Sequence, residues 1–198
     1  MSALVLASAS TVRARLLAEA GIAAESDPAD IDEGAIKQEC RRASQTAAEC
    51  AARLAEQKAR TVAARHPERF VLGADQLLDC GGAWLDKPRD RAEARDQLCA
   101  LRGHSHELVT AAATLRDGAL LWQTLARPRV TLRRFSDAFL EDYLAAMDDR
   151  VLKTVGGYEL EGLGAQLIEE IDGDYFAILG LPLLPLMSFL REIGALPS

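Results

Sequence analysis

The chain has 198 residues, of which 49% are hydrophobic and 27% are charged, and its formal net charge is −7. This length and composition are typical of one globular domain, and the acidic balance argues against broad nucleic-acid binding, which requires a basic surface. No apolar run reaches the roughly 18 to 20 residues that span a bilayer. The first eight residues lack the basic start and long apolar core of a signal peptide, so we expect a cytoplasmic protein with no membrane partner.

The four cysteines are widely spaced and form no CxxC pair. They stand at Cys40, Cys50, Cys80 and Cys99. In a cytoplasmic chain this pattern predicts free thiols and neither disulfides nor a structural zinc site.

The chain begins with a strand, a small polar turn and a helix. Residues 4–7 form a short apolar run, Ser10 is a good N-cap, and Gly21 suits the end of a helix that runs to about Ala20. Unpaired backbone N–H groups at such a helix start can receive phosphate. Ser8 and Ser10 could therefore hold phosphate oxygens together with Arg13. The same pattern also fits an ordinary capped helix with solvated arginines.

Two further segments supply charged candidates. Residues 30–33 form an acidic cluster of the kind that suits a hard divalent cation, although an acidic surface loop fits as well. Thr46 and Glu49 form a capping box before a helix to about Arg65. Lys58 lies in the apolar stripe of that helix, where it either extends past the edge of the core or points into a cleft.

Asp75 directly follows residues 70–74, which read as a buried strand. Ligands of α/β proteins gather at the carboxyl ends of strands, so a carboxylate there could hold a metal or take a proton from water, while a turn-capping aspartate is the alternative. A metal would help by acidifying water and neutralising phosphate charge. Lys87 precedes Pro88, which would stiffen the backbone beside a phosphate-binding ammonium, or it is simply an exposed lysine.

The remaining elements alternate between helices and hairpins. A helix from about Asp90 to Leu101 is followed by two extended segments around Asp117-Gly118, a helix capped by Ser136, a glycine-rich loop over residues 156–164, and a last helix from Pro182 to Gly194. This order predicts a mixed β-sheet flanked by helices, in two lobes around a cleft. His104 and His106 are better explained as structural than as zinc ligands, and neither a GxSxG elbow nor a P-loop motif is present.

The sequence resembles the Maf family of nucleotide pyrophosphatases, also called septum formation inhibitors, along nearly its whole length. The matching stretches, in family order, are residues 6–10 with Arg13 and Leu16-Leu17, residues 30–33, Leu54-Ala55 with Lys58-Ala59, residues 73–75, Lys87-Pro88, Gly103 with His106 and Thr110, residues 156–158, Glu161-Gly162, and residues 173–175 with 180–182. The resemblance implies a single domain over residues 1–198 with an elongated, two-lobed Maf/ITPase-like α/β fold around a central cleft. It also implies a homodimer.

The resemblance further implies a magnesium- or manganese-dependent hydrolysis of nucleoside triphosphates to monophosphate and pyrophosphate. By motif position, Asp75 would be the proton acceptor and Glu33 would hold the metal with it. Ser8, Arg13, Lys58 and Lys87 would hold the triphosphate, which needs several cations despite the acidic chain.

Three positions depart from the commonest family pattern. Val12 stands where an arginine is usual, Gln76 where threonine follows the aspartate, and Glu161 where glutamine precedes glycine. Gln76 and Glu161 resemble the branch described as 7-methyl-GTP pyrophosphatases. A carboxylate such as Glu161 can accept hydrogen bonds from the N1–H and N2–H₂ edge of guanine, whereas thymine and uracil offer no matching pair of donors.

Two other functions fit the same residues. A pyrophosphatase of the dTTP/UTP type could tolerate the changed positions. A nucleotide-binding regulator of division with little catalysis is favoured by the missing arginine at Val12, but has no need of Asp75 facing phosphates.

Overall fold

A computed structural model describes residues 4–197 of the chain, which divides into two compact units. The first unit comprises Met1–Gln76, Val109–Ala126 and Asp174–Ser198, and the second comprises Leu77–Leu108 and Arg127–Gly173. The hydrogen-bonded strand order is β2-β1-β3-β5-β7-β8, with β4 beside β3 and β6 beside β5. Because β1 pairs in parallel with β2 and β3 while the hairpin strands pair antiparallel, the predicted mixed sheet is confirmed.

The long strands β3 (Phe70–Cys80) and β5 (Ser105–Arg116) contribute to both units. The other elements of the first unit are β1 (Leu4–Leu6), α1 (Thr11–Glu19), β2 (Ala24–Ser26), α2 (Glu33–Arg42), α3 (Ala47–Ala63), β6 (Ala119–Ala126), α6 (Tyr175–Ile178) and α7 (Leu183–Glu192). Those of the second unit are β4 (Ala83–Leu85), α4 (Arg91–Leu101), β7 (Arg129–Leu132), α5 (Asp137–Met147), three short 3₁₀ turns between Asp148 and Leu167, and β8 (Ile168–Asp172).

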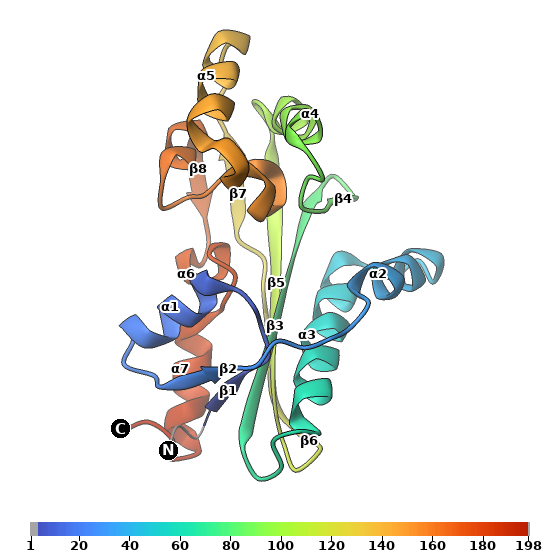
Figure 1. Ribbon diagram of the computed structural model, residues 1–198, viewed down its shortest axis with the longest axis vertical. Coiled ribbons are helices and arrows are strands. Elements are labelled where there is room, and N and C mark those ends of the chain that lie inside the picture. Colours follow the sequence, from blue (N-terminus) through green and yellow to red (C-terminus); the bar gives the residue numbers. More distant parts are fainter. Residues whose placement is uncertain (1–3, 198) are drawn as a thin grey trace. The chain divides into compact units, whose positions relative to one another are not determined.

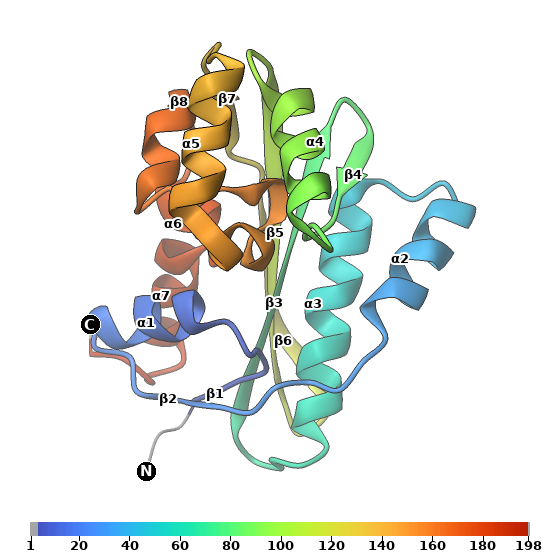
Figure 2. The same ribbon diagram turned by 45° about the horizontal axis from the view of Figure 1, so that its top comes forward.

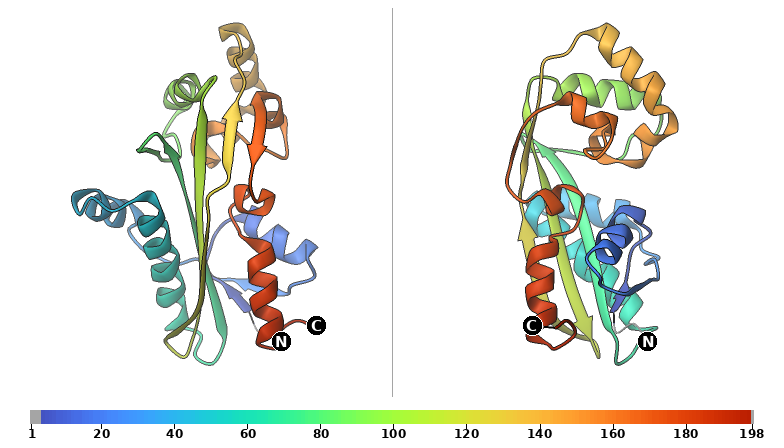
Figure 3. Two further views of the ribbon diagram at one scale, coloured as in Figure 1. Left: turned by 180° about the vertical axis from the view of Figure 1, so that it is seen from behind. Right: turned by 90° about the vertical axis from the view of Figure 1, so that its left-hand side faces the viewer.

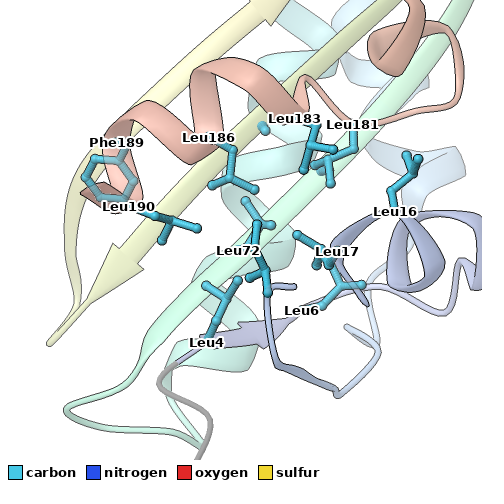
Figure 4. Close-up of a cluster of buried hydrophobic side chains, with 13 residues drawn as sticks. Leu4, Leu6, Leu16, Leu17, Leu72, Leu181, Leu183, Leu186, Phe189 and Leu190 are labelled. Atoms are coloured by element: carbon cyan, nitrogen blue, oxygen red, sulfur yellow. The ribbon is translucent and has the colours of Figure 1, made fainter. Parts of the chain in front are cut away.

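Helices cover both faces of β3 in the first unit. Helix α3 lies on one side of the strand, and α1 and α7 lie on the other (Figures 1 and 3). Leu72 packs on the α1 and α7 side in a cluster with Leu6, Leu17 and Leu186 (Figure 4). Successive side chains of a strand point to opposite faces, so the residues on either side of Leu72 face α3.

Helix α3 lies very close to β3 at Gly73. A Cβ atom added there would lie 2.1 Å from the backbone oxygen of Ala55 and 2.7 Å from the backbone nitrogen of Ala59. Since backbone atoms cannot move aside easily, only glycine permits this helix to lie so near the strand. The same approach brings Lys58, one residue before Ala59, against β3.

The predicted helix caps are confirmed. Ser10 accepts from the backbone N–H of Arg13, and Thr46 and Glu49 form the reciprocal capping box of α3. Asp90 and Ser136 cap α4 and α5 in the same way. Each cap satisfies a backbone donor that the first turn of a helix cannot, which fixes where the helix begins.

The predicted end of the strand at residue 74 was wrong. Strand β3 continues to Cys80, because Leu78–Cys80 pair with Ala83–Leu85 of β4 across a turn at Gly81-Gly82. Asp75 therefore lies within the strand and not after it. It still lies beyond the parallel pairing with β1, which ends where Leu6 meets Leu72.

In the second unit, helices α4 and α5 lie side by side (Figure 2). The four cysteines are free thiols as predicted, with Cys40 and Cys50 fully buried. None of the helices within residues 4–197 is both long and apolar enough to cross a membrane.

We expect the substitution Gly73→Ala to lower the free energy of unfolding by about 3 kcal/mol, since the added methyl forces α3 away from β3. Urea denaturation followed by circular dichroism measures this. Gly34→Ala is the control, because Gly34 is exposed in the first turn of α2 with an ordinary φ, and an added Cβ would approach only Oδ1 of the exposed Asp32, at 3.3 Å. It should change stability by no more than about 1 kcal/mol. Equal effects of the two substitutions would contradict the packing argument.

Candidate active site

The site is centred on an ion-paired cluster of three side chains in the first unit. The ammonium Nζ of Lys58 lies 2.5 Å from Oδ1 of Asp75 and 2.7 Å from Oε1 of Glu33. The side chains of Lys58 and Asp75 are 9% and 6% exposed, whereas that of Glu33 is 46% exposed. The cluster is therefore closed on the side of the sheet and open on the side of α2.

Three elements bring these residues together. Asp75 is on the same face of β3 as Gly73, because the two are two residues apart, and that face meets α3. Lys58 comes from the buried stripe of α3. Glu33 is the first residue of α2, whose N-cap Asp32 accepts from the backbone N–H of Ala35. Of the acidic segment 30–33, Asp32 thus caps a helix and Glu33 reaches the cluster.

The electrostatics of the cluster lower the pKa of Glu33. Burial alone would raise the pKa of Glu33. The charge and hydrogen bond of Lys58 outweigh burial, with smaller contributions from Lys37 and Arg13, so the pKa of Glu33 lies below its ordinary value. Oδ2 of Asp75 is buried and accepts no hydrogen bond from any described residue. An unpartnered carboxylate oxygen inside a protein is costly, so it is a candidate for contact with a ligand.

Arg13 lies in the interior next to this cluster. Its Nε donates to the backbone oxygen of Gly180 at 2.7 Å, and its Nη1 donates to Ala74 O at 2.9 Å and to Ser8 Oγ at 3.1 Å. Burial lowers the pKa of Arg13, while the negative charges of Asp75 and Glu33 oppose that shift. Arg13 therefore ties α1 to β3 and to the segment before α7, and its contact with phosphate stays a prediction.

Gln76 is held in a comparable way on the opposite face of β3. Its Nε2 donates to Thr110 Oγ1 at 2.8 Å and to the backbone oxygens of Ala177 and Ile178 at 2.9 and 3.1 Å. Thr110 Oγ1 in turn donates to Ala177 O at 2.9 Å. The sequence motifs include Thr110 but give no sign that it fixes Gln76, since the two are 34 positions apart.

The other predicted site residues take different positions. Ser10 is the N-cap of α1, and Val12 packs against the hydrophobic cluster between α1 and α7. Lys87 and Glu161 are exposed residues of the second unit. Their part in a site with Asp75 stays a prediction.

The two carboxylates suit a hard divalent cation that other ligands complete. Within residues 4–197, no cluster of three or more His, Cys, Asp or Glu side chains could hold a metal. Mg²⁺ commonly takes only one or two carboxylates and fills its remaining positions with phosphate oxygens and water. Glu33 and Asp75, with the unpartnered Oδ2, fit that use of a metal and do not fit a site built from protein ligands alone.

Comparison with known proteins places the chain in a family. Its sequence matches the Maf-like protein family over residues 3–193. The chain belongs to the Maf-like family. The resemblance carried by the short motifs is thereby confirmed, and the mixed sheet with flanking helices is the fold expected of such a protein.

Curated relatives cover nearly the whole chain. A protein of Paramagnetospirillum magneticum named nucleoside triphosphate pyrophosphatase is 50% identical over 97% of this chain and 99% of its own length. One of Granulibacter bethesdensis with the same name is 49% identical over 98% of both chains. A protein of Rhizobium meliloti named 7-methyl-GTP pyrophosphatase is 44% identical, again over 98% of both.

Among the family's motif residues, His106 is structural, as the sequence analysis favoured. It is 2% exposed, and its Nε2 lies 2.6 Å from the hydroxyl of Tyr158. Burial lowers the pKa of His106 from 6.5 to about 4. The folded protein thus favours the neutral imidazole, so the unfolded chain binds more protons between these two pH values.

We expect stability to be full above pH 6.5 and to fall as the pH drops toward 4, with His106 contributing up to about 3 kcal/mol of that loss. His106→Gln should remove this part of the pH dependence, and the exposed His104→Gln should keep it. Free energies of unfolding of the three proteins, measured from pH 4 to 7.5, test this. Parallel curves for wild type and His106→Gln would refute the assignment.

Proposed function

We propose that this chain hydrolyses a nucleoside triphosphate between its α- and β-phosphates and releases a nucleoside monophosphate and pyrophosphate. The observation that carries this function is the Asp75 carboxylate, which presents one oxygen to Lys58 and keeps the other without a partner. Membership of the Maf-like family and the names of the curated relatives support the same reaction.

In this mechanism Asp75 acts on the attacking water and Lys58 acts on the leaving group. Asp75 Oδ2 accepts a proton from a water molecule as the water oxygen bonds to the α-phosphorus. The bond from the α-phosphorus to the bridging oxygen then breaks, and its electron pair leaves with pyrophosphate. Lys58 lies beside Asp75 and stabilises the negative charge that grows on the departing group.

Glu33 and Asp75 would hold a divalent metal in this site. Mg²⁺ or Mn²⁺ held by Glu33 and Asp75 would neutralise phosphate charge and make the attacking water more acidic. The protein's own part is to hold the two carboxylates on one side of the site. Helix α2 places Glu33 at its first turn, and β3 places Asp75 in a rigid strand.

Two further residues that match the family's motifs are part of this proposal. Lys87 supplies a further cation for the triphosphate, and Glu161 accepts hydrogen bonds from the base. An acceptor of this kind favours guanine and its cationic 7-methyl form over thymine and uracil, because the pyrimidines offer the carboxylate no matching pair of donors. The name of the Rhizobium meliloti relative agrees with that preference.

A regulator that binds nucleotides with little catalysis is the second candidate, and Val12 in place of the usual arginine is the observation that favours it. In that case nucleotide would bind at equilibrium in saturating Mg²⁺ or Mn²⁺ without product formation. A dTTP/UTP-type pyrophosphatase is a variant of the main proposal. The oligomeric state is proposed to be a homodimer.

We expect Asp75→Asn to reduce the rate of pyrophosphate release about 1,000-fold or more, because the amide cannot take the proton from water. A coupled pyrophosphate assay with saturating metal measures this. Asp96→Asn, an exposed change on α4, is the control and should keep the wild-type rate. Circular dichroism must show that both variants are folded. Near-wild-type release by Asp75→Asn would remove Asp75 from the role of base.

A panel of 7-methyl-GTP, GTP, dTTP and UTP tests the choice of base. We expect kcat/KM to be highest for the guanine nucleotides, and Glu161→Gln to lower the guanine-to-pyrimidine ratio about tenfold or more, since a charged acceptor is lost. Glu169→Gln, an exposed change on β8, should leave that ratio unchanged. A wild-type preference for dTTP and UTP would reject the assignment of Glu161 and favour the pyrimidine branch.

A further inference from the structure

We propose that Lys58 keeps free divalent metal out of the Glu33–Asp75 carboxylate pair, so that the metal enters the site only together with a triphosphate. This inference rests on the proposed function, which it deepens by assigning an order to metal and substrate. It concerns Lys58 in the free protein, before the residue meets any phosphate.

The Lys58 ammonium occupies the place where a metal would bind both carboxylates. Lys58 Nζ lies 2.7 Å from Glu33 Oε1 and 2.5 Å from Asp75 Oδ1, so it bonds to both carboxylates at once. A divalent cation bound by the same two oxygens would have to occupy nearly the same space. Two positive charges so close together repel strongly where little water screens them, and Lys58 is 9% exposed.

The charges of the cluster also disfavour binding of a metal ion alone. The two carboxylates, Glu33 and Asp75, are matched by two cations, Lys58 and Arg13, and Arg13 is close enough to feel both carboxylates. Lys37 adds a further positive charge near Glu33, so the cluster has no net negative charge without any ligand. A divalent ion alone meets no net negative charge there, in spite of the acidic composition of the chain.

The protein also supplies few metal ligands at this place. Within the described part of the chain no third carboxylate, histidine or cysteine joins Glu33 and Asp75 as a metal ligand. Mg²⁺ and Mn²⁺ prefer six oxygen ligands, so two carboxylates already bound to an ammonium make a poor site. A site that needs ligands from elsewhere is completed by phosphate oxygens.

A bound triphosphate changes the position of Lys58, the charge of the cluster and the number of metal ligands. It brings about four negative charges and several oxygen ligands, and it offers Lys58 Nζ anionic partners other than the carboxylates. Once Lys58 turns to the phosphates, Asp75 Oδ1 becomes available to the incoming cation, while Oδ2, which has no hydrogen-bond partner, stays free for water. Because binding linkage is reciprocal, the factor by which nucleotide tightens metal binding equals the factor by which metal tightens nucleotide binding.

The test measures the affinity of the full-length protein for Mn²⁺ without nucleotide. Electron paramagnetic resonance reports the concentration of free Mn²⁺ during the titration. Wild type should bind weakly, and Lys58→Met should bind at least about tenfold more tightly, because the competing charge is gone. Lys58→Arg keeps the charge and should bind as weakly as wild type. Lys153→Met removes an exposed lysine of the second unit and controls for net charge.

A second measurement guards against poor folding of the variant. Thermal denaturation should show that Mn²⁺ stabilises Lys58→Met far more than wild type, since the metal replaces the missing cation beside Asp75. If Lys58→Met does not fold, Lys58→Gln takes its place in both assays. In wild type, a non-hydrolysable α,β-methylene triphosphate should tighten Mn²⁺ binding at least about tenfold.

The inference is overturned if wild type binds Mn²⁺ alone as tightly as Lys58→Met, or if Lys58→Arg binds as tightly as Lys58→Met. Failure of the proposed function gives a different result. In that case no nucleotide yields pyrophosphate, while the Mn²⁺ affinity of Lys58→Met still differs from that of wild type.

Discussion

The buried ion pair between Lys58 and Asp75 is the interaction on which the candidate site depends. Two charged groups leave water to form it, and that desolvation is repaid only when the geometry is close and further partners are present. Here Glu33 supplies the further partner for the ammonium. The pair can form because Gly73 lets α3 lie directly against β3, so a backbone feature with no chemistry of its own sets the geometry of the charged groups.

The alternation of side chains along β3 separates two tasks. Asp75 faces α3 and the charged cluster, while Gln76 faces the opposite side and binds the backbone oxygens at the end of α6. Arg13 binds Gly180 of the same segment. Carbonyl oxygens can only accept hydrogen bonds, so these contacts fix Nε2 of Gln76 toward α6 and turn its Oε1 away. Gln76 can therefore offer a ligand only an acceptor.

Local signals in the sequence predicted the helices and their caps well. They could not predict contacts between residues that are far apart in the chain. Caps such as Ser10 and the Thr46–Glu49 pair depend on neighbours within one turn, so their chemistry is readable from the chain. Helical periodicity placed Lys58 on the buried face of its helix. It could not decide between a solvated lysine and one paired with Asp75, because the partner lies on another element.

The misplaced strand end has the same origin. The polar residues Asp75 and Gln76 interrupt the apolar run after Ala74, but the strand continues through Leu77 and Leu78 because β4 pairs with its far end. Arg13 shows the limit most clearly. A family motif marks it as important, yet the motif cannot say whether its donors face a ligand or the protein's own carbonyl groups, and here three of its contacts are internal.

A protein with a net charge of −7 that handles a polyanion needs a local reversal of charge. In the cluster Lys58 and Arg13 are matched by Glu33 and Asp75, and Lys37 adds only one further cation near Glu33. A bound divalent ion would supply the positive charge that the side chains do not. Metal dependence would then follow from the charge balance of the cluster as much as from the chemistry of phosphate. The carboxylates would have two tasks, because they would hold the divalent ion when it is bound and restrain Lys58 before the ion arrives.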